Sequence, residues 1–299
     1  MVTVPIKALE THAARALQTA STACVHSVFT SGMNLVLDTG TWLFLGMERE
    51  KKLPYEMQVE EGPWQSLREN VHPHMTFTQQ GNRLVCNAEE LRLDVSKAEL
   101  HAVPFMQEEK KPDVSLPTLE FFLSVVEERG EENGLEINSL GFIERYLAKM
   151  PMTHPLEKQL AHLLEHCLTG EVNENDFRFL MGRGKGLTPS GDDLLIGWLA
   201  VDSATALFGD GFRSAIARLA RTGVTTDVSK NALLHAVDHL YPSDVTATVR
   251  ASLREEQREL KDAINSVLAT GHTSGADTLF GILTGLVVLR KQTDWRKAQ

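Results

Sequence analysis

Residues 181–201 read MGRGKGLTPSGDDLLIGWLAV, and this stretch sets the character of the larger part of the chain. A glycine-rich loop ends at Pro189, and an uncharged apolar run from Leu194 to Val201 follows shortly after it. Ser190 and Asp193 have the spacing of a capping box, in which the serine oxygen accepts a hydrogen bond from an early helical N–H group. The stretch therefore predicts a buried helix over 192–208, behind a tight loop.

A second segment repeats this pattern. The sequence SGDDLLIG of residues 190–197 aligns with SGADTLFG of residues 274–281, sharing the form S-G-x-D-x-L-x-G. Capping and helix packing can produce such a match, but neither demands a glycine directly after the serine. We infer two related helix–turn–helix units and expect the N-termini of their second helices to face one shared pocket.

The remaining sequence after Pro117 is also periodic in the manner of amphipathic helices. Besides the helix over 192–208, we expect helices over 118–129, 139–150, 156–168, 212–221, 228–240, 244–269 and 276–290. The longest of these carries one apolar stripe, made of Val245, Val249, Leu253, Leu260, Ile264 and Val267.

The first part of the chain has a different pattern. Apolar residues from Ile6 to Ala20 recur at helical spacing and predict a short opening helix. Runs rich in Val, Thr and Phe, broken by Gly, Asn and Pro, then indicate β-hairpins in a small sheet or barrel. The charged stretch 107–117 contains two prolines and is typical of a linker. The expected fold class is α+β, with a β-rich domain and leading helix over 1–110 and a larger all-α domain over 111–299.

Composition excludes several classes of protein. The 299 residues carry a formal net charge of −10, which argues against nucleic acid as a partner because a phosphate backbone requires a basic surface. The longest apolar stretches reach about eight residues, whereas a membrane-spanning helix needs about 20. Three widely spaced cysteines imply no disulfide framework, and no signal peptide is recognisable at the start of the sequence. We therefore expect a cytoplasmic protein that does not associate with membranes.

The glycine-rich loop predicts an anion-binding site. Alternating glycines expose consecutive N–H groups at the entrance to a helix, and Arg183 and Lys185 add positive charge. A Ser/Thr-rich segment after Gly223 and the turn before Ala276 are further candidates. The expected substrate-binding residues are Arg183, Gly184, Lys185, Gly186, Thr188, Ser190, Gly191, Thr225, Thr226, Ser229, Thr273, Ser274 and Gly275.

Acidic residues at the same positions are the candidates for catalysis. Asp192, Asp193 and Asp277 either cap the helices, or hold Mg²⁺ that bridges to phosphate, or accept N–H groups from a substrate amide. His272 is either a proton donor near neutral pH or a histidine stabilised at a helix C-terminus. No metal ligands are assigned, and Mg²⁺ stays an open possibility.

The segments GxGLTPSGDD (184–193), TTxVS (225–229) and GHTSGAD (271–277) resemble those of the AllH (YlbF-type) family. That family is associated with oxamate carbamoyltransferase in the anaerobic use of allantoin, a branch of purine catabolism. The resemblance implies a subunit of a hetero-oligomer with FdrA-like and AllG-like partners. Such a complex interconverts oxalurate plus phosphate with oxamate plus carbamoyl phosphate, so the implied ligands are a small anionic carbamoyl substrate and phosphate.

Two other interpretations remain open at this point. In the first, the chain is a non-catalytic subunit that binds a ligand and holds its partners together. Alternatively, His162, Glu165 and His166 spell the H-x-x-E-H signature of a zinc hydrolase. The second interpretation is the weaker one, because five-residue matches arise by chance and no third ligand follows.

Overall fold

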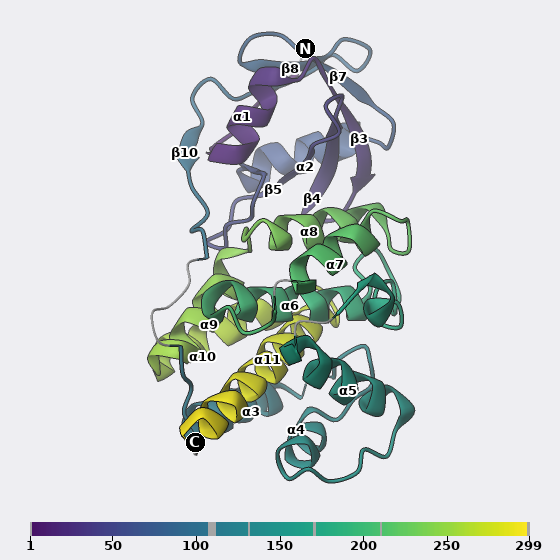
Figure 1. The fold of residues 1–299 in the computed structure, drawn as a ribbon. Coiled ribbons are helices and arrows are strands. Elements are labelled where there is room, and N and C mark those ends of the chain that lie inside the picture. Colours follow the sequence, from purple (N-terminus) through teal and green to yellow (C-terminus); the bar gives the residue numbers. More distant parts are fainter. Residues whose placement is uncertain (1, 107–111, 131, 170–171, 210, 298–299) are drawn as a thin grey trace. The chain divides into compact units, whose positions relative to one another are not determined.

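The computed structural model describes residues 2–106, 112–130, 132–169, 172–209 and 211–297 (Figure 1). The chain divides into two compact units, Met1–Pro104 and Phe105–Gln299. The first unit is built on a β-sheet and the second is helical, so the predicted α+β class is confirmed. No helix in the described part of the chain is long and apolar enough to cross a membrane.

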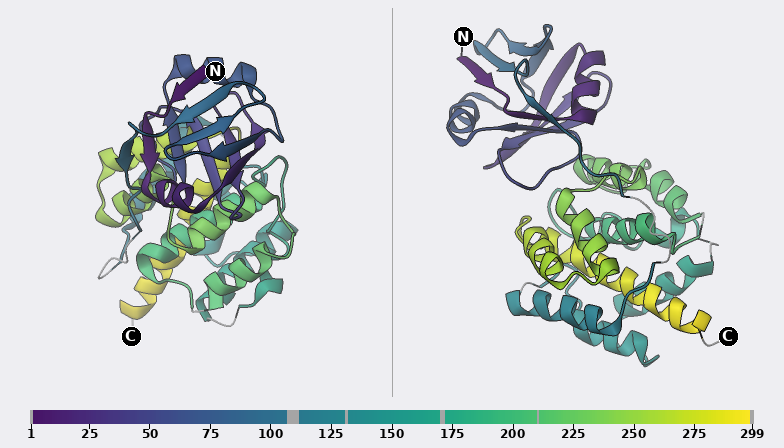
Figure 2. Two further views of the ribbon diagram at one scale, coloured as in Figure 1. Left: turned by 90° about the horizontal axis from the view of Figure 1, so that it is seen from above. Right: turned by 90° about the vertical axis from the view of Figure 1, so that its left-hand side faces the viewer.

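The described residues of the N-terminal unit form a ten-stranded sheet that curls around its own core, seen from two further directions in Figure 2. The strand order is β1-β9-β8-β7-β3-β4-β5-β6-β2-β10. Because β1 and β2 are consecutive but pair with β9 and β6, respectively, they bring the two sides of the sheet together. The strands are β1 (Val2–Pro5), β2 (Ala8–Glu10), β3 (Thr22–Val28), β4 (Gly32–Leu37), β5 (Trp42–Met47), β6 (Glu56–Val59), β7 (Thr76–Gln79), β8 (Arg83–Cys86), β9 (Leu91–Asp94) and β10 (Glu99–His101).

Two helices, α1 (Thr11–Thr19) and α2 (Glu61–Asn70), complete this unit. The predicted opening helix is shorter than expected, because Ile6 and Leu9 are buried in the core of the sheet and not on a helix face. The helix begins only after Glu10, whose carboxylate accepts hydrogen bonds from the backbone N–H groups of His12 and Ala13. A side-chain cap of this kind marks the helix start more sharply than the apolar spacing does.

The C-terminal unit contains a short 3₁₀ turn (Glu174–Phe177) and the helices that the sequence predicts, with one exception. They are α3 (Leu116–Arg129), α4 (Ser139–Leu147), α5 (Pro155–Thr169), α6 (Ser190–Thr205), α7 (Gly211–Ala220), α8 (Asp227–Val237), α9 (Ser243–Arg254), α10 (Gln257–Leu268) and α11 (Ser274–Lys297). The predicted linker over 107–117 lies partly outside the described residues. For the last part of this segment the linker prediction is wrong, because Val114 is fully buried and Ser115 caps α3.

The exception is the long helix expected over 244–269, which is two helices. Glu255 has a φ of +58°, a left-handed conformation that ends α9. The chain then turns and α10 packs against α9. The apolar stripe is nevertheless used as expected, since Val249, Leu260 and Ile264 are fully buried. The prediction failed because a stripe with a helical period looks the same whether one helix or two carry it.

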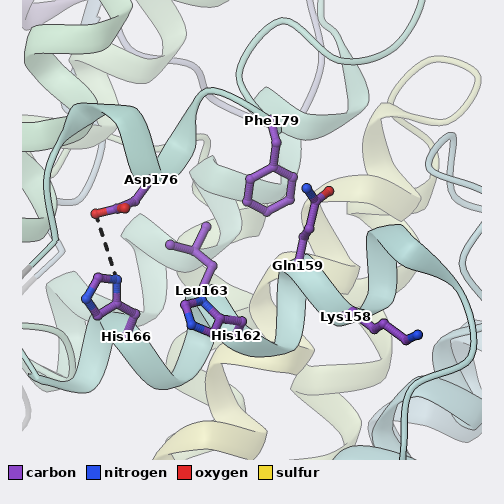
Figure 3. A pocket seen from close by; sticks show the side chains of 7 residues that line it. All are labelled: Lys158, Gln159, His162, Leu163, His166, Asp176 and Phe179. Atoms are coloured by element: carbon purple, nitrogen blue, oxygen red, sulfur yellow. Dashed lines mark ion pairs between the residues drawn. The ribbon is translucent and has the colours of Figure 1, made fainter.

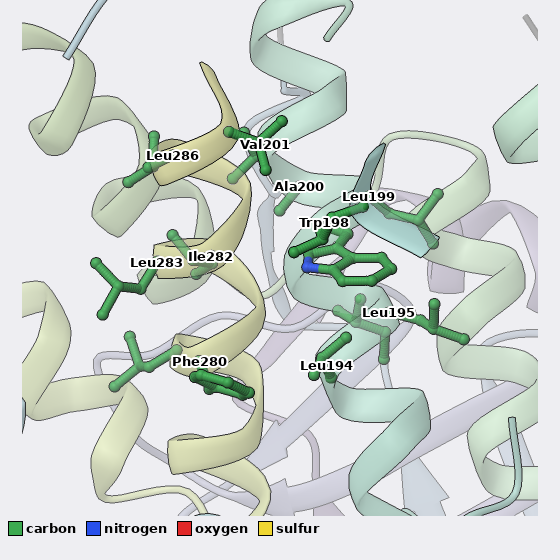
Figure 4. Close-up of a cluster of buried hydrophobic side chains, with 14 of the residues drawn as sticks. Leu194, Leu195, Trp198, Leu199, Ala200, Val201, Phe280, Ile282, Leu283 and Leu286 are labelled. Atoms are coloured by element: carbon green, nitrogen blue, oxygen red, sulfur yellow. The ribbon is translucent and has the colours of Figure 1, made fainter. Parts of the chain in front are cut away.

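Helices α6 and α11 form the centre of the C-terminal unit (Figures 1 and 4). Every residue of α6 is buried, and α11 is buried from Gly275 to Leu289. Apolar side chains such as Leu194 and Ile282 fill the space around the crossing (Figure 4), and Trp198 donates a 2.9 Å hydrogen bond from Nε1 to Oγ1 of Thr284. This packing fixes the two repeated motifs relative to each other.

Candidate functional site

The two repeated motifs meet at the beginnings of α6 and α11. Oγ1 of Thr188, just before α6, lies 2.7 Å from Oγ of Ser274, the first residue of α11. The equivalent glycines also pack alike, because a Cβ on Gly191 would collide with the carbonyl oxygen of Leu180 and a Cβ on Gly275 with that of Val267. The structure thus brings together the two segments that the internal repeat places in one site.

The predicted capping box at Ser190 is wrong. The N-cap of α6 is Pro189, no side chain caps the helix, and Ser190 is its first residue. The carbonyl oxygen of Pro189 accepts from the N–H groups of Asp192 and Asp193, and that of Arg183 accepts from Gly191.

The first turn of α11 is satisfied in the same way. The N–H groups of Gly275 and Asp277 donate to the carbonyl oxygens of Thr270 and Thr273. The helix-entry amides of Gly191 and Gly275, expected to contact a ligand, are therefore occupied by the chain itself.

The unoccupied amides belong instead to the glycine-rich loop. The backbone N–H groups of residues 184–188 donate to no other residue in the described part of the chain, and residues 183–187 are exposed. Gly184 anchors this loop against α6 with a φ of +125°, and a Cβ there would lie only 2.5 Å from the nitrogen of Ser190. A run of exposed N–H groups with φ values that favour glycine is a suitable cradle for an anion.

Asp192 is fully buried and holds this loop in place. Its Oδ1 accepts a 2.8 Å hydrogen bond from the N–H of Gly182, and its Oδ2 accepts from Ser229 at 2.7 Å and from the Thr225 hydroxyl. Burial raises the pKa of Asp192, and these hydrogen bonds oppose that shift. Because both carboxylate oxygens have protein donors, the geometry favours a positioning role for Asp192.

Thr226 belongs to the same arrangement. Its hydroxyl accepts from the N–H of Ser229 at 3.1 Å and so caps α8, and it also donates to the carbonyl oxygen of Leu187 in the loop. The Ser/Thr-rich segment predicted as a third candidate thus supports the glycine-rich loop from the side of α8.

Asp193 and Asp277 differ from Asp192 in one decisive respect. Each is buried, with exposed fractions of 6% and 0%, and in each the Oδ2 atom is buried without a hydrogen-bond partner. Oδ1 of Asp277 accepts a 2.8 Å hydrogen bond from the N–H of Gly134, in the loop between α3 and α4. The two aspartates occupy equivalent positions in the repeated motifs, so the site contains a symmetric pair of buried acceptors.

The charges of this pair are coupled. Burial raises the pKa of Asp193 well above its ordinary value, and the negative charge of Asp277 raises it further. Burial also raises the pKa of Asp277. The hydroxyl of Ser274 opposes the shift at Asp193, and the hydroxyl of Ser190 opposes the shift at Asp277. Each motif therefore supplies a serine to the aspartate of the other motif.

Gly134 was not predicted from the sequence. A Cβ there would lie 2.8 Å from Oγ1 of Thr273 and 3.3 Å from Oδ2 of Asp277, and closer still to Oγ of Ser190. The only local signal is the Asn133-Gly134 dipeptide, which is typical of a turn. Its place in the site depends on a tertiary contact that no spacing in the sequence reveals.

Three of the predicted site residues, in the glycine-rich loop or in the turn before α11, are exposed. His272 and Lys185 are exposed, and neither makes a hydrogen bond or ion pair with another described residue. Arg183 is also exposed, but its Nε donates to the carbonyl oxygen of Phe179 at 2.6 Å. Lys185 is therefore the cation whose charge is available to an anion on the loop.

The zinc hydrolase interpretation is wrong. His162 and His166 line a cavity of about 290 Å³ on α5 together with Asp176, 3.8 Å from Nδ1 of His166 (Figure 3). Glu165 is bound elsewhere, by the hydroxyl of Tyr146 at 2.7 Å and by Lys291. Among the described residues, no group of three or more His, Cys, Asp or Glu side chains is arranged to hold a metal ion.

Comparison with protein families accounts for both units. Residues 180–286 match the family described as oxamate carbamoyltransferase subunit AllH, and residues 6–100 match the AllH family N-terminal domain. The chain belongs to the AllH family. The first match spans the glycine-rich loop, α6 and most of the apolar part of α11, and hence both copies of the repeated motif. The AllH description makes this chain a subunit of a transferase complex, and no solved structure matches it.

Proposed function

We propose that this AllH subunit carries the carbamoyl-transfer site of a complex that interconverts oxalurate plus phosphate with oxamate plus carbamoyl phosphate. The observation that supports this most strongly is that one site contains both hydrogen-bond donors and hydrogen-bond acceptors that have no partner in the described part of the chain. The N–H groups of residues 184–188 on the loop donate to no other described residue, and the unpartnered Oδ2 atoms of Asp193 and Asp277 lie buried at the beginnings of α6 and α11. A reaction between a carbamoyl donor, which carries N–H groups, and anionic phosphate requires both kinds of group.

The loop is suited to the anionic reactant. Backbone N–H groups and the charge of Lys185 would bind phosphate and orient one of its oxygens toward the carbamoyl carbon. In the forward direction this oxygen forms the new C–O bond as the C–N bond of oxalurate breaks. The proton of hydrogen phosphate is then transferred to the departing oxamate nitrogen, so atoms and charges balance.

The aspartate pair is suited to the proton transfer. A carboxyl group with a raised pKa can hold a proton that it donates and recovers within one turnover. Burial raises the pKa of Asp193 and favours this state, and the negative charge of Asp277 beside it favours it further. The hydroxyls of Thr188, Ser190 and Ser274 would have to turn away from their present partners in order to donate to the oxyanion of the tetrahedral intermediate.

Mg²⁺ is compatible with this site only together with substrate. Mg²⁺ usually binds one or two protein carboxylates along with phosphate oxygens and water. Asp193 and Asp277 each offer one free oxygen atom, so phosphate oxygens would have to complete the coordination. A comparison of rates with and without Mg²⁺ decides whether the reaction uses it.

The test is reconstitution of the complex. The chain is co-expressed with FdrA-like and AllG-like partners, and carbamoyl phosphate formation from oxalurate and phosphate is measured. Asp193→Asn is expected to lower the rate at least 100-fold while the complex still assembles. Asp244→Asn is the matched control, because Asp244 is also buried in the first turn of a helix but lies outside the site.

The scaffold alternative gives different results. If Asp193→Asn loses activity only because the complex no longer assembles, the chain holds its partners together without catalysing the reaction. Unchanged turnover in an assembled complex with Asp193→Asn contradicts the proposed site.

A further inference from the structure

Asp193 and Asp277 are a pair of buried acceptors, and one oxygen atom of each lacks a hydrogen-bond partner among the described residues. Asp193 and Asp277 are both more than nine-tenths buried, and Oδ2 of each is without a hydrogen-bond partner. Other buried carboxylates in this unit are satisfied: Asp192 has three donors, and Asp244 accepts from Ser266 and from the N–H of Val245. Buried acceptors left without donors are costly, so a ligand that supplies N–H groups would be strongly favoured there.

The geometry around the pair limits what that ligand group can be. Gly134 approaches the pair so closely that even a Cβ would meet Ser190, which leaves little room for a bulky group on that side. The hydroxyls of Thr188 and Ser274 are hydrogen-bonded to each other and lie beside Asp193. A flat, small group with two N–H bonds matches these restrictions.

We infer that the terminal –NH₂ of the carbamoyl group binds between Asp193 and Asp277, donating one N–H to each Oδ2 atom; oxamate, itself a primary amide with a carboxylate, serves as the probe. This inference rests on the proposed function and adds the orientation of the substrate. The –NH₂ end enters first and is buried, so that the carbamoyl carbon faces the phosphate bound on the loop of residues 184–188. The repeat in the sequence then has a chemical meaning, because each motif supplies one acceptor to the same nitrogen.

The experiment varies both the ligand and the protein in the assembled complex. Dissociation constants are measured by calorimetry for oxamate, N-methyloxamate and N,N-dimethyloxamate, which carry two, one and no N–H bonds. Each lost N–H is expected to weaken binding about 10-fold in the unmodified protein, in line with hydrogen bonds to charged acceptors. Equal affinities across the series would overturn the inference.

Variants separate lost hydrogen bonds from steric exclusion by the methyl groups. Asp193→Ala and Asp277→Ala remove one acceptor and add space, so the preference for oxamate over its methylated forms should shrink about 10-fold in each. Asp244→Ala is the control and should retain the full preference. Phosphate affinity within about twofold of the unmodified protein shows that the loop is intact. A preference that survives both site substitutions would contradict the inference.

A further pair of results distinguishes this inference from the proposed function. If the complex discriminates among the methylated ligands but forms no carbamoyl phosphate, the orientation is correct and the proposed reaction is wrong. If it forms carbamoyl phosphate without such discrimination, the reaction stands and the inference fails. Glycine serves as a probe for an ammonium group, and tighter binding of glycine than of oxamate would also overturn the inference.

Discussion

Gly197 of α6 and Gly281 of α11 occupy equivalent positions in the repeated motifs, and each faces the other helix where the two cross. A Cβ on Gly197 would collide with the carbonyl oxygen of Thr278, and a Cβ on Gly281 with that of Leu194. Leu194 and Thr278 are themselves equivalent in the repeat, so the crossing is locally two-fold symmetric. This close approach holds the two helix beginnings together, and with them Asp193 and Asp277.

Substitution at the crossing should be destabilising. Gly197→Ala or Gly281→Ala forces the helices apart, and overpacking of this kind costs about 1–3 kcal/mol. Thermal unfolding of the C-terminal unit should shift downward by several degrees. The control is Gly62→Ala on α2, where a Cβ meets no atom within 4 Å and alanine is the better helix former. An unchanged Tm in both crossing variants would contradict this account of the packing.

Removal of the buried charge should stabilise the protein at neutral pH. Burial raises the pKa of Asp193 in the folded state above its ordinary value of 3.8. The wild-type chain therefore loses stability as the pH rises from the ordinary pKa to the raised pKa. Asp193→Asn does not ionise and escapes this loss, which we expect to be about 1–3 kcal/mol. Unfolding followed from pH 3 to pH 8 should show equal stabilities at the acid end and a more stable variant at neutral pH. A variant that is less stable at pH 7 would contradict the predicted direction.

The anchor of the glycine-rich loop should be intolerant of a side chain. Gly184→Ala places a Cβ against Ser190 in a conformation that alanine rarely adopts, so the loop must move. Carbamoyl phosphate formation should fall at least 100-fold, with little change in Tm because the loop is exposed. Gly223→Ala is the matched control: its φ is +78° and a Cβ there meets no atom within 4 Å. Comparable losses in both variants would show that backbone strain alone, and not the contact with Ser190, causes the effect.

Substitution of Thr225 should show whether Asp192 holds the glycine-rich loop in place. Thr225→Val removes one of the donors to Oδ2 of Asp192 without touching the reacting groups. We expect the KM for phosphate to rise about 10-fold with a smaller change in kcat, as a misplaced loop binds its anion less well. Thr225→Ser restores the hydroxyl and should restore the KM. Failure of this rescue would show that the methyl group of Thr225, and not its hydrogen bond, matters.

The H-x-x-E-H segment should be dispensable for activity. Glu165 is bound by Tyr146 and Lys291, so Glu165→Gln should alter stability by about 1 kcal/mol or less and leave turnover within twofold. Metal analysis of the purified complex should find no stoichiometric zinc. Stoichiometric zinc together with loss of turnover in this variant would restore the hydrolase interpretation.

Much of the fold could be predicted because its signals are local. Apolar spacing located most helices of the C-terminal unit, and short β-branched runs indicated the sheet. The errors arose where a tertiary or capping contact outweighs the spacing. Ile6 and Leu9 have helical spacing but are buried in a sheet, and the left-handed conformation of Glu255 divides an unbroken stripe between two helices.

The candidate site, like the fold, could be predicted only in part. The repeat around Ser190 and Ser274 was sufficient to predict that two distant segments meet. The sequence could not show that the helix-entry amides are satisfied by their own chain, or that Gly134 closes over Asp277 from another loop. It also could not separate Asp192 from Asp193, because their difference lies only in which oxygen atoms have donors.

The most direct test of the central claim is the kcat for carbamoyl phosphate formation by complexes that carry Asp193→Asn, Asp277→Asn or both. If the two aspartates act on one carbamoyl group, each single substitution should lower the rate at least 100-fold, and the double substitution should be little worse than the single ones. Losses that multiply in the double variant, or a single variant within twofold of the wild-type rate, would contradict a shared site.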